Sequence, residues 1–314
     1  MKTREIFRVI KPGLLTTIQD MGRIGYQRYG VPVSGAMDTY AFQLANILVG
    51  NPRGEACLEV TLTGPELEAK TSITIAITGA NIEPMVNGKR KPMWTSFRMK
   101  TGDRLRFGKY QAGVFAYIAI AGGFSSPSFF DSRSTDIQSG LGKALEANAH
   151  LRGNPMEGKH GISMNNYLIP TYQKKAEVAV IEGPHTESIP SAYRSMFFEK
   201  EFTLQANSNR MGYRLQAEDL SLEEIDSIWS DAVPFGGVQI LPNGQPIILM
   251  ADRQTTGGYP RIGTIIATDI PKVAQLVPSS KISFYPVSIE EAQSRYNRRE
   301  MLLTNLSTFR NNIK

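Results

Sequence analysis

A short polar segment, ADRQTTGGYP at residues 251–260, separates two apolar runs that have the composition of strands. Its aspartate could act as a base or fix a neighbouring base, and its arginine could hold a carboxylate or phosphate through two hydrogen bonds. Two threonine hydroxyls add donors, and the glycine pair allows consecutive N–H groups to face one anion, the arrangement called a nest. An ordinary turn, in which the acid and the base pair with each other, is the structural alternative. The candidate residues are Asp252, Arg253, Thr255, Thr256, Gly257, Gly258 and Tyr259.

A second polar segment, TTIQDMGRIGYQRYGVPVSGAMD at residues 16–38, carries Asp20, Arg23 and Asp38 among four glycines. It lacks the apolar period of a core element and directly precedes a predicted helix, and helix starts favour anions. The glycine spacing is not G-x-G-x-x-G after a strand, so no dinucleotide fingerprint is present. The segment predicts either a second part of an anion site or a structural loop.

Two shorter motifs are weaker candidates. In FFDSRSTD, Arg133 and Asp136 could enter a site, and in SNRMGYRL, Asn209 and Arg210 could do the same. Each pair could equally well bind a loop carbonyl.

Other kinds of chemistry find little support. The three histidines, at 150, 160 and 185, lack metal-ligand spacing and accompany no nucleophile motif, so no metal site or serine triad is expected. No G-x-x-x-x-G-K-[ST] string exists, so a P-loop is absent. The Met99–Lys100 pair does not by itself indicate a biotin-bearing lysine, and Cys57, in EACLEV, has the setting of a buried core thiol.

The elements that must position these loops are mostly strands. In SITIAITG, Ile73, Ile75 and Ile77 alternate with smaller residues, which predicts a half-buried strand, and NGKRKP at 87–92 predicts a hairpin turn. Helices are predicted over 34–52, with Gly50 as the C-terminal cap, and over 268–278, with Asp269 as the N-cap. A C-terminal helix is predicted to open with a capping box of Ser288 and Glu291, and its register is carried by Ala292, Tyr296, Leu303 and Leu306.

The chain of 314 residues is expected to form a mainly β (α+β) fold in two domains, 1–170 and 171–314. Residues 133–166 are glycine-rich and polar, which predicts a long loop before the second series of strands. The two halves show faint self-similarity, as between YGVPVSGAMD and DAVPFGGVQI, which is too weak to prove duplication.

Composition and charge limit the partners. Hydrophobic residues make up 41% and charged residues 20%, as in ordinary folded proteins, and the net charge of +6 is spread along the chain. A nucleic-acid protein would need a basic stripe with exposed aromatics, so acidic small molecules are better candidates. No signal peptide or membrane span is recognised, and one cysteine excludes an internal disulfide, so a cytoplasmic location is expected.

Four strings together resemble the KipA family, also called allophanate hydrolase subunit 2 or the C subunit of 5-oxoprolinase. They are KPGLLTTIQDMGRIGYQRYGVPVSGAMD, SNRMGYRL, GGVQILPNGQPIIL and ADRQTTGGYPRIG, and the likeness runs from about residue 8 to residue 287. The resemblance implies a β-rich fold with cyclophilin-like barrel topology and a few peripheral helices. It also implies an N-terminal carboxyltransferase-like subdomain and a C-terminal cyclophilin-like one.

The resemblance further implies one subunit of an ATP-dependent 5-oxoprolinase, which opens 5-oxo-L-proline to L-glutamate with a KipI-like subunit and a LamB/YcsF-like subunit. Two alternatives remain open: a regulatory protein that binds a KipI-like kinase inhibitor, and a carboxyltransferase that acts with a biotinylated partner. The sequence carries no biotin-carrier segment, no biotin-carboxylase ATP pattern and no amidase signature. ATP is therefore expected to be shared with partner subunits, and no biotin is expected on this chain.

Under the enzymatic hypothesis the two glycine-rich loops meet at a cleft that a partner completes. The expected catalytic residues are Asp252, Arg253, Thr255 and Thr256, with Asp252 orienting or deprotonating water. Arg23 is expected to anchor the substrate carboxylate. The expected substrate-binding residues are Asp20, Arg23, Asp38, Asn209, Arg210, Gly257, Gly258 and Tyr259.

Overall fold

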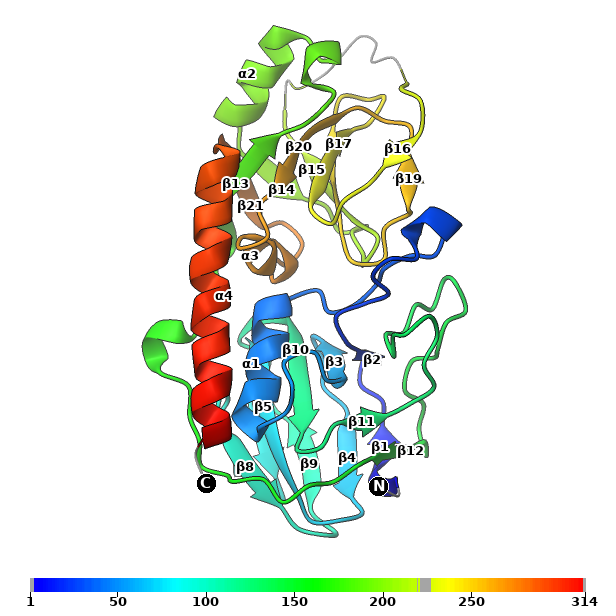
Figure 1. The fold of residues 1–314 in the computed structure, drawn as a ribbon, viewed down its shortest axis with the longest axis vertical. Coiled ribbons are helices and arrows are strands. Elements are labelled where there is room, and N and C mark those ends of the chain that lie inside the picture. The colour runs from blue at the N-terminus through cyan, green and yellow to red at the C-terminus, as the bar shows by residue number, and fades with distance from the viewer. Residues whose placement is uncertain (1–2, 219, 221–226, 313–314) are drawn as a thin grey trace. The chain divides into compact units, whose positions relative to one another are not determined.

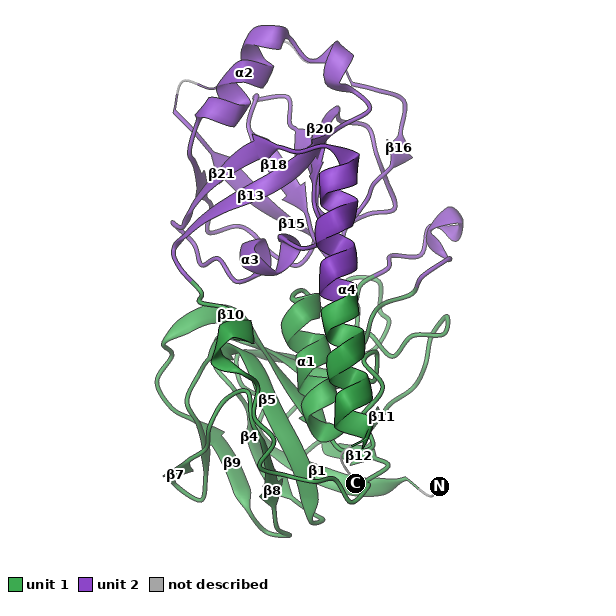
Figure 2. Cartoon of the chain, turned by 60° about the vertical axis from the view of Figure 1, so that its left-hand side comes forward, with its two compact units in different colours: residues 1–23, 34–172, 301–314 green, residues 24–33, 173–300 purple. Residues whose placement is uncertain are grey.

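The computed structural model describes residues 3–218, 220 and 227–312, and these form a mainly β fold with four α-helices (Figure 1). The chain divides into two compact units that interleave in sequence (Figure 2). Unit 1 contains residues 1–23, 34–172 and 301–314, and unit 2 contains residues 24–33 and 173–300. The sequence predicted two continuous domains with one boundary near residue 170. The structure instead exchanges a short segment and half of the last helix between the units.

Unit 1 is built on two antiparallel sheets. The seven-stranded sheet has the order β11 (Phe124–Ser125), β12 (His150–Gly153), β1 (Arg4–Lys11), β4 (Glu66–Ala69), β9 (Arg104–Phe107), β6 (Pro84–Val86) and β7 (Lys89–Arg90). The five-stranded sheet has the order β2 (Leu15–Gln19), β3 (Cys57–Thr61), β10 (Ala112–Ile120), β5 (Ile73–Asn81) and β8 (Ser96–Met99). Apolar side chains from both sheets form one buried core.

Helix α1 (Thr39–Val49) covers the other face of the five-stranded sheet, against β5 and β10. Thr78 of β5 donates its hydroxyl hydrogen to the Ala41 carbonyl of α1 at 2.7 Å. The prediction of a half-buried strand in SITIAITG, residues 72–79, was therefore wrong, because β5 is buried on both faces. The alternating threonines and alanines mark the face under the helix, not a solvent face.

Unit 2 is a closed seven-stranded barrel, as the resemblance implied. The strands follow the order β13 (Lys175–Glu182), β20 (Arg261–Ile265), β17 (Gly237–Ile240), β18 (Pro246–Leu249), β15 (Gly212–Gln216), β14 (Phe202–Leu204) and β21 (Lys281–Pro286). The β13–β21 pair is parallel, and the other pairs are antiparallel. A two-stranded ribbon joins β16 (Asp231–Ala232) to β19 (Thr256–Gly257).

The remaining helices lie on or after the barrel. Helix α2 (Ser191–Glu199) packs on β21, where Phe197 stacks on Phe284 with ring centroids 4.7 Å apart. The other two helices are α3 (Ile270–Ala274) and α4 (Ile289–Asn312). Single 3-10 turns are η1 (Gln27–Tyr29), η2 (Asn166–Leu168) and η3 (Thr186–Ser188). None of the helices in the described part is long and apolar enough to cross a membrane.

The end signals of the predicted helices are mostly confirmed. Gly50 ends α1 with a φ of 83°, and Asp269 precedes α3, although its carboxylate caps no helical N–H and instead accepts the Ala179 N–H at 2.9 Å. At α4 the Ser288 hydroxyl accepts the Glu291 N–H at 3.2 Å, but the Glu291 carboxylate binds Arg295. The capping box is therefore only half formed.

Two other predictions need correction. Tyr296 is 44% exposed, so it does not share the buried register of Ala292 and Leu303 on α4. The segment predicted as a long loop, 133–166, contains strand β12, which pairs with β1 and β11.

The hairpin at 87–92 is confirmed, since β6 and β7 pair across Asn87 and Gly88, both at positive φ.

Candidate functional site

Asp20 joins two loops of unit 1. One carboxylate oxygen accepts the Gly22 N–H at 2.8 Å and the hydroxyls of Ser132 and Ser134 at 2.7 and 2.5 Å. The other oxygen accepts the Arg133 N–H at 2.6 Å. The sequence predicted a substrate-binding acid here. In the structure its oxygens are taken up in holding the loop at 132–134 against the turn after β2.

Arg23 is fully buried in the same loop cluster and donates to the Ser134 carbonyl. A guanidinium with no exposed surface cannot contact a substrate carboxylate. The predicted anchoring role of Arg23 is therefore not available in this conformation.

Asp38 caps helix α1. Its carboxylate accepts the Ala41 N–H at 2.9 Å and the Tyr172 hydroxyl hydrogen at 3.2 Å, and the side chain is fully buried. An aspartate that caps the N-terminal N–H groups is well placed against the helix dipole. Asp38 thus stabilises the start of the helix and is closed to a ligand.

A buried network that the sequence did not reveal holds the loop before α1. The Glu59 carboxylate on β3, 2% exposed, accepts the Met37 N–H at 2.9 Å and the Tyr117 hydroxyl hydrogen at 2.8 Å. The Tyr117 oxygen in turn accepts the Asp38 N–H at 2.7 Å. Burial, and then the charge of Glu59, raise the pKa of Tyr117 well above its usual range. The only sequence signal was a carboxylate in the apolar run CLEVT.

The weaker pair in FFDSRSTD is also used locally. Arg133 makes an ion pair with Glu55 at 2.7 Å, and Asp136 accepts the N–H groups of Gln138 and Ser139 at 3.1 and 3.2 Å. Both side chains therefore stabilise loop turns.

In unit 2, Asp252 pairs with Arg210 and not with its neighbour Arg253. Its two carboxylate oxygens accept from Nε and a terminal nitrogen of Arg210 at 2.7 and 2.9 Å, and its N–H donates to the Arg210 carbonyl at 2.9 Å. Both carboxylate oxygens of Asp252 are therefore already engaged by the Arg210 guanidinium. The structure therefore does not support the expected role of Asp252 in deprotonating water.

Arg253 ties its segment to the stretch between β16 and β17. Its Nε donates to the Val233 carbonyl at 2.9 Å, and its guanidinium lies 5.6 Å from the centre of the Phe235 ring. Burial lowers the pKa of Arg253 to about 10, against the opposing charge of Asp252. The guanidinium remains charged at neutral pH but is only 6% exposed, so it faces carbonyls instead of a ligand.

The glycine pair does not form the predicted nest. Neither Gly257 nor Gly258 has a positive φ, and Gly257 pairs with Asp231 in the β16–β19 ribbon, beside Thr256. A nest needs a residue in the left-handed region. Close packing favours glycine at position 257 for another reason, because a Cβ there would lie 2.7 Å from Nε2 of Gln239.

A cavity with several polar lining residues lies on the wall made by β15, β17 and β18 of unit 2, and we call it the barrel pocket. It has a volume of about 240 Å³. Two predicted residues, Asn209 and Tyr259, line it, and Arg210 and Asp252 hold the turn that carries Asn209. The other lining residues are Asn207, Met211, Gly212, Arg214, Gln239, Leu241, Ile247, Leu249 and Gln254.

The barrel pocket combines an apolar floor with groups suited to a small polar acid. The side chains of Arg214 and Gln254 make no hydrogen bond with any other described residue, and Gln239 donates to the Tyr259 carbonyl at 3.1 Å. A guanidinium can hold a carboxylate, and carboxamides can donate to and accept from an amide. The pocket lining contains no carboxylate, histidine or cysteine, so it can bind and orient such a ligand but offers no base.

No group of three or more histidine, cysteine or acidic side chains suited to a metal ion occurs in the described ranges.

The sequence profile of the carboxyltransferase domain, subdomain A and B, matches residues 29–286. The chain is 35% identical over 298 residues to the C subunit of 5-oxoprolinase from Haemophilus influenzae, covering 91% of this chain and 93% of that protein. The C subunit of the Escherichia coli 5-oxoprolinase is 36% identical over 291 residues with the same coverage. Urea amidolyase of Saccharomyces cerevisiae is 30% identical over 94% of this chain, but the match spans only 17% of that protein.

Solved structures share the fold. The K. lactis urea amidolyase superposes with a TM-score of 0.89 and 29% identity, covering 98% of this chain and 20% of that chain. TTHA0988 superposes with a TM-score of 0.82 and 27% identity, covering 90% of this chain and 55% of that chain. Both solved chains are thus considerably longer than the part that matches.

Proposed function

The chain belongs to the carboxyltransferase domain, subdomain A and B, family, and from this we propose that it is one subunit of an ATP-dependent 5-oxoprolinase. In this proposal the complex opens 5-oxo-L-proline to L-glutamate, and its other members are a KipI-like subunit and a LamB/YcsF-like subunit. The observation that carries the proposal is the match to two proteins, each named as the C subunit of a 5-oxoprolinase, over 93% of their length.

The barrel pocket is the proposed substrate site on this chain. Arg214 would hold the carboxylate of 5-oxoproline, the Asn209 NH2 group would donate to the lactam carbonyl, and the Gln254 side-chain oxygen would accept the lactam N–H. The volume of about 240 Å³ lies just below the ~300–1,000 Å³ typical of drug-sized ligands, which suits a small metabolite.

The reaction adds one water molecule to the lactam. The water oxygen bonds to the carbonyl carbon, the ring C–N bond breaks, and the nitrogen takes a proton to become the amine of glutamate. Because the pocket lining lacks a base, the group that takes the proton of water would come from outside this pocket, and a partner subunit is the proposed source. The role of this chain is to bind and orient the lactam.

ATP is assigned to the partner subunits. Arg253, the arginine that the sequence offered for a phosphate, donates to backbone carbonyls, so no step on this chain is routed through the nucleotide.

The test is 5-oxoproline-dependent ATP hydrolysis by the reconstituted subunits, with this chain present, omitted or carrying Arg214→Ala. The expected result is loss of turnover when the chain is omitted and a raised KM with Arg214→Ala. Full turnover without the chain would rule out the enzymatic role and leave a regulatory binding role.

The carboxyltransferase domain profile and a relative named putative urea carboxylase favour a second candidate, carboxyl transfer with a biotinylated partner. Proteins that co-purify with this chain can be probed with labelled streptavidin. A biotinylated partner together with carboxyl transfer to an acceptor would support this candidate, whereas its absence beside an active 5-oxoprolinase complex would remove it.

A further inference from the structure

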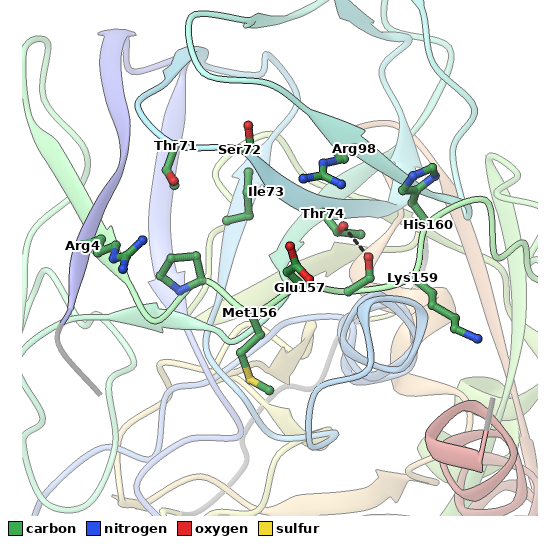
Figure 3. Close-up of a pocket in the computed structure, with 12 residues that line it drawn as sticks. Arg4, Thr71, Ser72, Ile73, Thr74, Arg98, Met156, Glu157, Lys159 and His160 are labelled. Atoms are coloured by element: carbon green, nitrogen blue, oxygen red, sulfur yellow. Dashed lines mark hydrogen bonds between the residues drawn. The ribbon is translucent and has the colours of Figure 1, made fainter. Parts of the chain in front are cut away.

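Unit 1 carries a second and larger cavity, which the proposed reaction does not use. This cavity, the charged groove, has a volume of about 660 Å³ (Figure 3). It lies beside the first residues of β1 and β5 and the last part of β8, and the segment at 155–160 borders it. Its lining residues are Arg4, Thr71, Ser72, Ile73, Thr74, Arg98, Pro155, Met156, Glu157, Gly158, Lys159 and His160.

Three charged side chains of the groove have no partner in the described part of the chain. Arg4, Arg98 and Glu157 form no side-chain hydrogen bond, and none has an oppositely charged side-chain atom within the 4.0 Å of an ion pair. In Figure 3, Arg4 lies at one end of the groove, Glu157 lies in the middle, and Arg98 lies beyond it. The opposite charges share one cavity without neutralising each other by direct contact.

Separate anchored segments hold these three residues. Arg4 pairs with Gly153 across β1 and β12, and Arg98 pairs with Thr74 across β8 and β5. The segment that carries Glu157 is fixed on both sides, because Met156 N–H donates to the Ala121 carbonyl at 3.1 Å and the Thr74 hydroxyl donates to the Gly158 carbonyl at 2.9 Å. The backbone positions that carry the three charges are therefore fixed, two by the sheets and one by hydrogen bonds on either side of Glu157.

We propose that the charged groove binds an acidic α-amino acid. Such a molecule has an α-carboxylate and an α-ammonium on one carbon and a second carboxylate at the end of its side chain. The α-carboxylate pairs with Arg98, the α-ammonium pairs with Glu157, and the side-chain carboxylate points toward Arg4. Thr71 and Ser72 add hydroxyl donors along the same wall.

Glu157 is the residue that selects this class of ligand. A phosphate or a simple dicarboxylate would satisfy the two arginines but would place negative charge beside Glu157, which is unfavourable. Lys159 does not change this pattern, because its side chain extends away from the other lining residues in Figure 3.

The ligand class follows from the groove alone, but its biological meaning rests on the proposed function. The proposed reaction forms L-glutamate, which is an acidic α-amino acid. The groove would then bind the product of the complex at a site other than the barrel pocket, and product could regulate turnover from there.

Binding is tested by isothermal titration of the full chain, without partner subunits, with L-glutamate, glutarate, pyrophosphate and 5-oxo-L-proline. L-Glutamate is expected to bind on the order of tenfold more tightly than glutarate, which lacks the ammonium. No glutamate binding, or tighter binding of pyrophosphate than of glutamate, would overturn the proposal.

Variants locate the bound amino acid. Arg98→Ala is expected to weaken L-glutamate binding on the order of tenfold or more, and Glu157→Gln is expected to abolish the preference for glutamate over glutarate. Arg104→Ala is the matched control, since Arg104 is an exposed strand arginine on β9 outside the groove. Equal loss in the control, or unchanged binding in Arg98→Ala, would contradict the assignment.

The two proposals fail separately. Binding of 5-oxo-L-proline is expected to depend on Arg214 and not on Arg98, and glutamate binding on Arg98 and not on Arg214. Glutamate binding at the groove in a chain that proves inactive in 5-oxoproline turnover would keep the site and remove only its regulatory meaning.

Discussion

Asp252 and Arg210 are joined at three points: two hydrogen bonds between carboxylate and guanidinium, at 2.7 and 2.9 Å, and one between their backbones at 2.9 Å. The pairing of β15 with β18, in which Gly212 lies opposite Leu249, brings together these two residues that are 42 positions apart. Both side chains are only about a tenth exposed, at 12% and 11%. Asp252, the acid that the sequence suggested for catalysis, therefore supports the turn beside the barrel pocket.

Replacing Asp252 by alanine is expected to destabilise the protein. The change leaves a largely buried guanidinium without its carboxylate, at a cost of about 1–3 kcal/mol in the free energy of unfolding. Urea denaturation measures this cost. Asp231→Ala serves as the control, because Asp231 is 48% exposed and lies 3.9 Å from Arg261, and the expected loss there is below about 1 kcal/mol. A similar loss in both variants would contradict a framing role for the Asp252 pair.

Tyr117→Phe is expected to weaken the loop before α1. The change removes the hydroxyl that donates to Glu59 and accepts from the Asp38 N–H, so two buried polar groups lose a partner, at about 1–3 kcal/mol. Thermal unfolding reports the loss, with Tyr167→Phe, 97% exposed, as the neutral control. If Tyr117→Phe melts with the wild type, the network does not hold the loop.

The protein is expected to lose stability at alkaline pH. Burial raises the pKa of Cys57 and of Tyr117 well above the ordinary values of 9.0 and 10.0. Above those values the unfolded chain releases protons that the folded chain retains, so the unfolded state binds fewer protons and stability falls as the pH rises. Urea midpoints measured from neutral pH to about 10.5 follow the decline. In Tyr117→Phe the urea midpoint should fall less steeply above pH 10. An unchanged slope in that variant would exclude Tyr117 as a cause of the alkaline loss of stability.

The two glycines of the ribbon region are expected to respond differently to alanine. At Gly257 the new Cβ lies 2.7 Å from Nε2 of Gln239, so that side chain must shift, which disturbs its hydrogen bond to the Tyr259 carbonyl and the lining of the barrel pocket. At Gly258 the nearest atom lies 3.4 Å away, which is an ordinary contact. We expect Gly257→Ala to weaken 5-oxo-L-proline binding by several-fold (about 1 kcal/mol) and Gly258→Ala to leave it unchanged. Equal effects would instead point to a shared role of the two N–H groups.

Arg310 is expected to secure the last turns of α4 to unit 1. Its guanidinium donates to the Leu48 carbonyl at 3.3 Å and to the Lys159 carbonyl at 3.2 Å, and Leu48 lies in the last turn of α1, where a cation is favourable. Arg310→Ala should cost about 1–2 kcal/mol by chemical denaturation. Arg298→Ala, an exposed position on the same helix, should cost almost nothing, and a comparable loss there would show that the effect belongs to the helix and not to this contact.

Local signals in the sequence were enough to predict helix α1 and the 87–92 hairpin. The period of apolar residues, Gly50 with a φ of 83° and the Asn87–Gly88 turn all act within a few residues of one another. The resemblance to a known family supplied the barrel and the two-part organisation, which periodicity alone does not give.

The candidate site was harder to predict because its partners are distant in sequence. Asp252 could have paired with Arg253 beside it, and only the register of β15 against β18 shows that it pairs with Arg210. Arg214, Gln239 and Gln254 are ordinary polar residues in strings with no motif, and they meet only because their strands and loops adjoin at one wall of the barrel. The glycine pair at 257–258 shows the opposite error. Its unusual sequence suggested an anion site, but Gly257 lies in an ordinary two-stranded ribbon.

Helix α4 contributes its residues up to Glu300 to unit 2 and its residues from Met301 onward to unit 1. During synthesis the ribosome releases the N-terminal sheets long before the segment that carries Arg310, although that segment belongs with them. The part of the molecule that is translated first is therefore the last to be completed. A chain that lacks Arg310 would leave the carbonyls of Leu48 and Lys159 without their guanidinium and should be more prone to degradation.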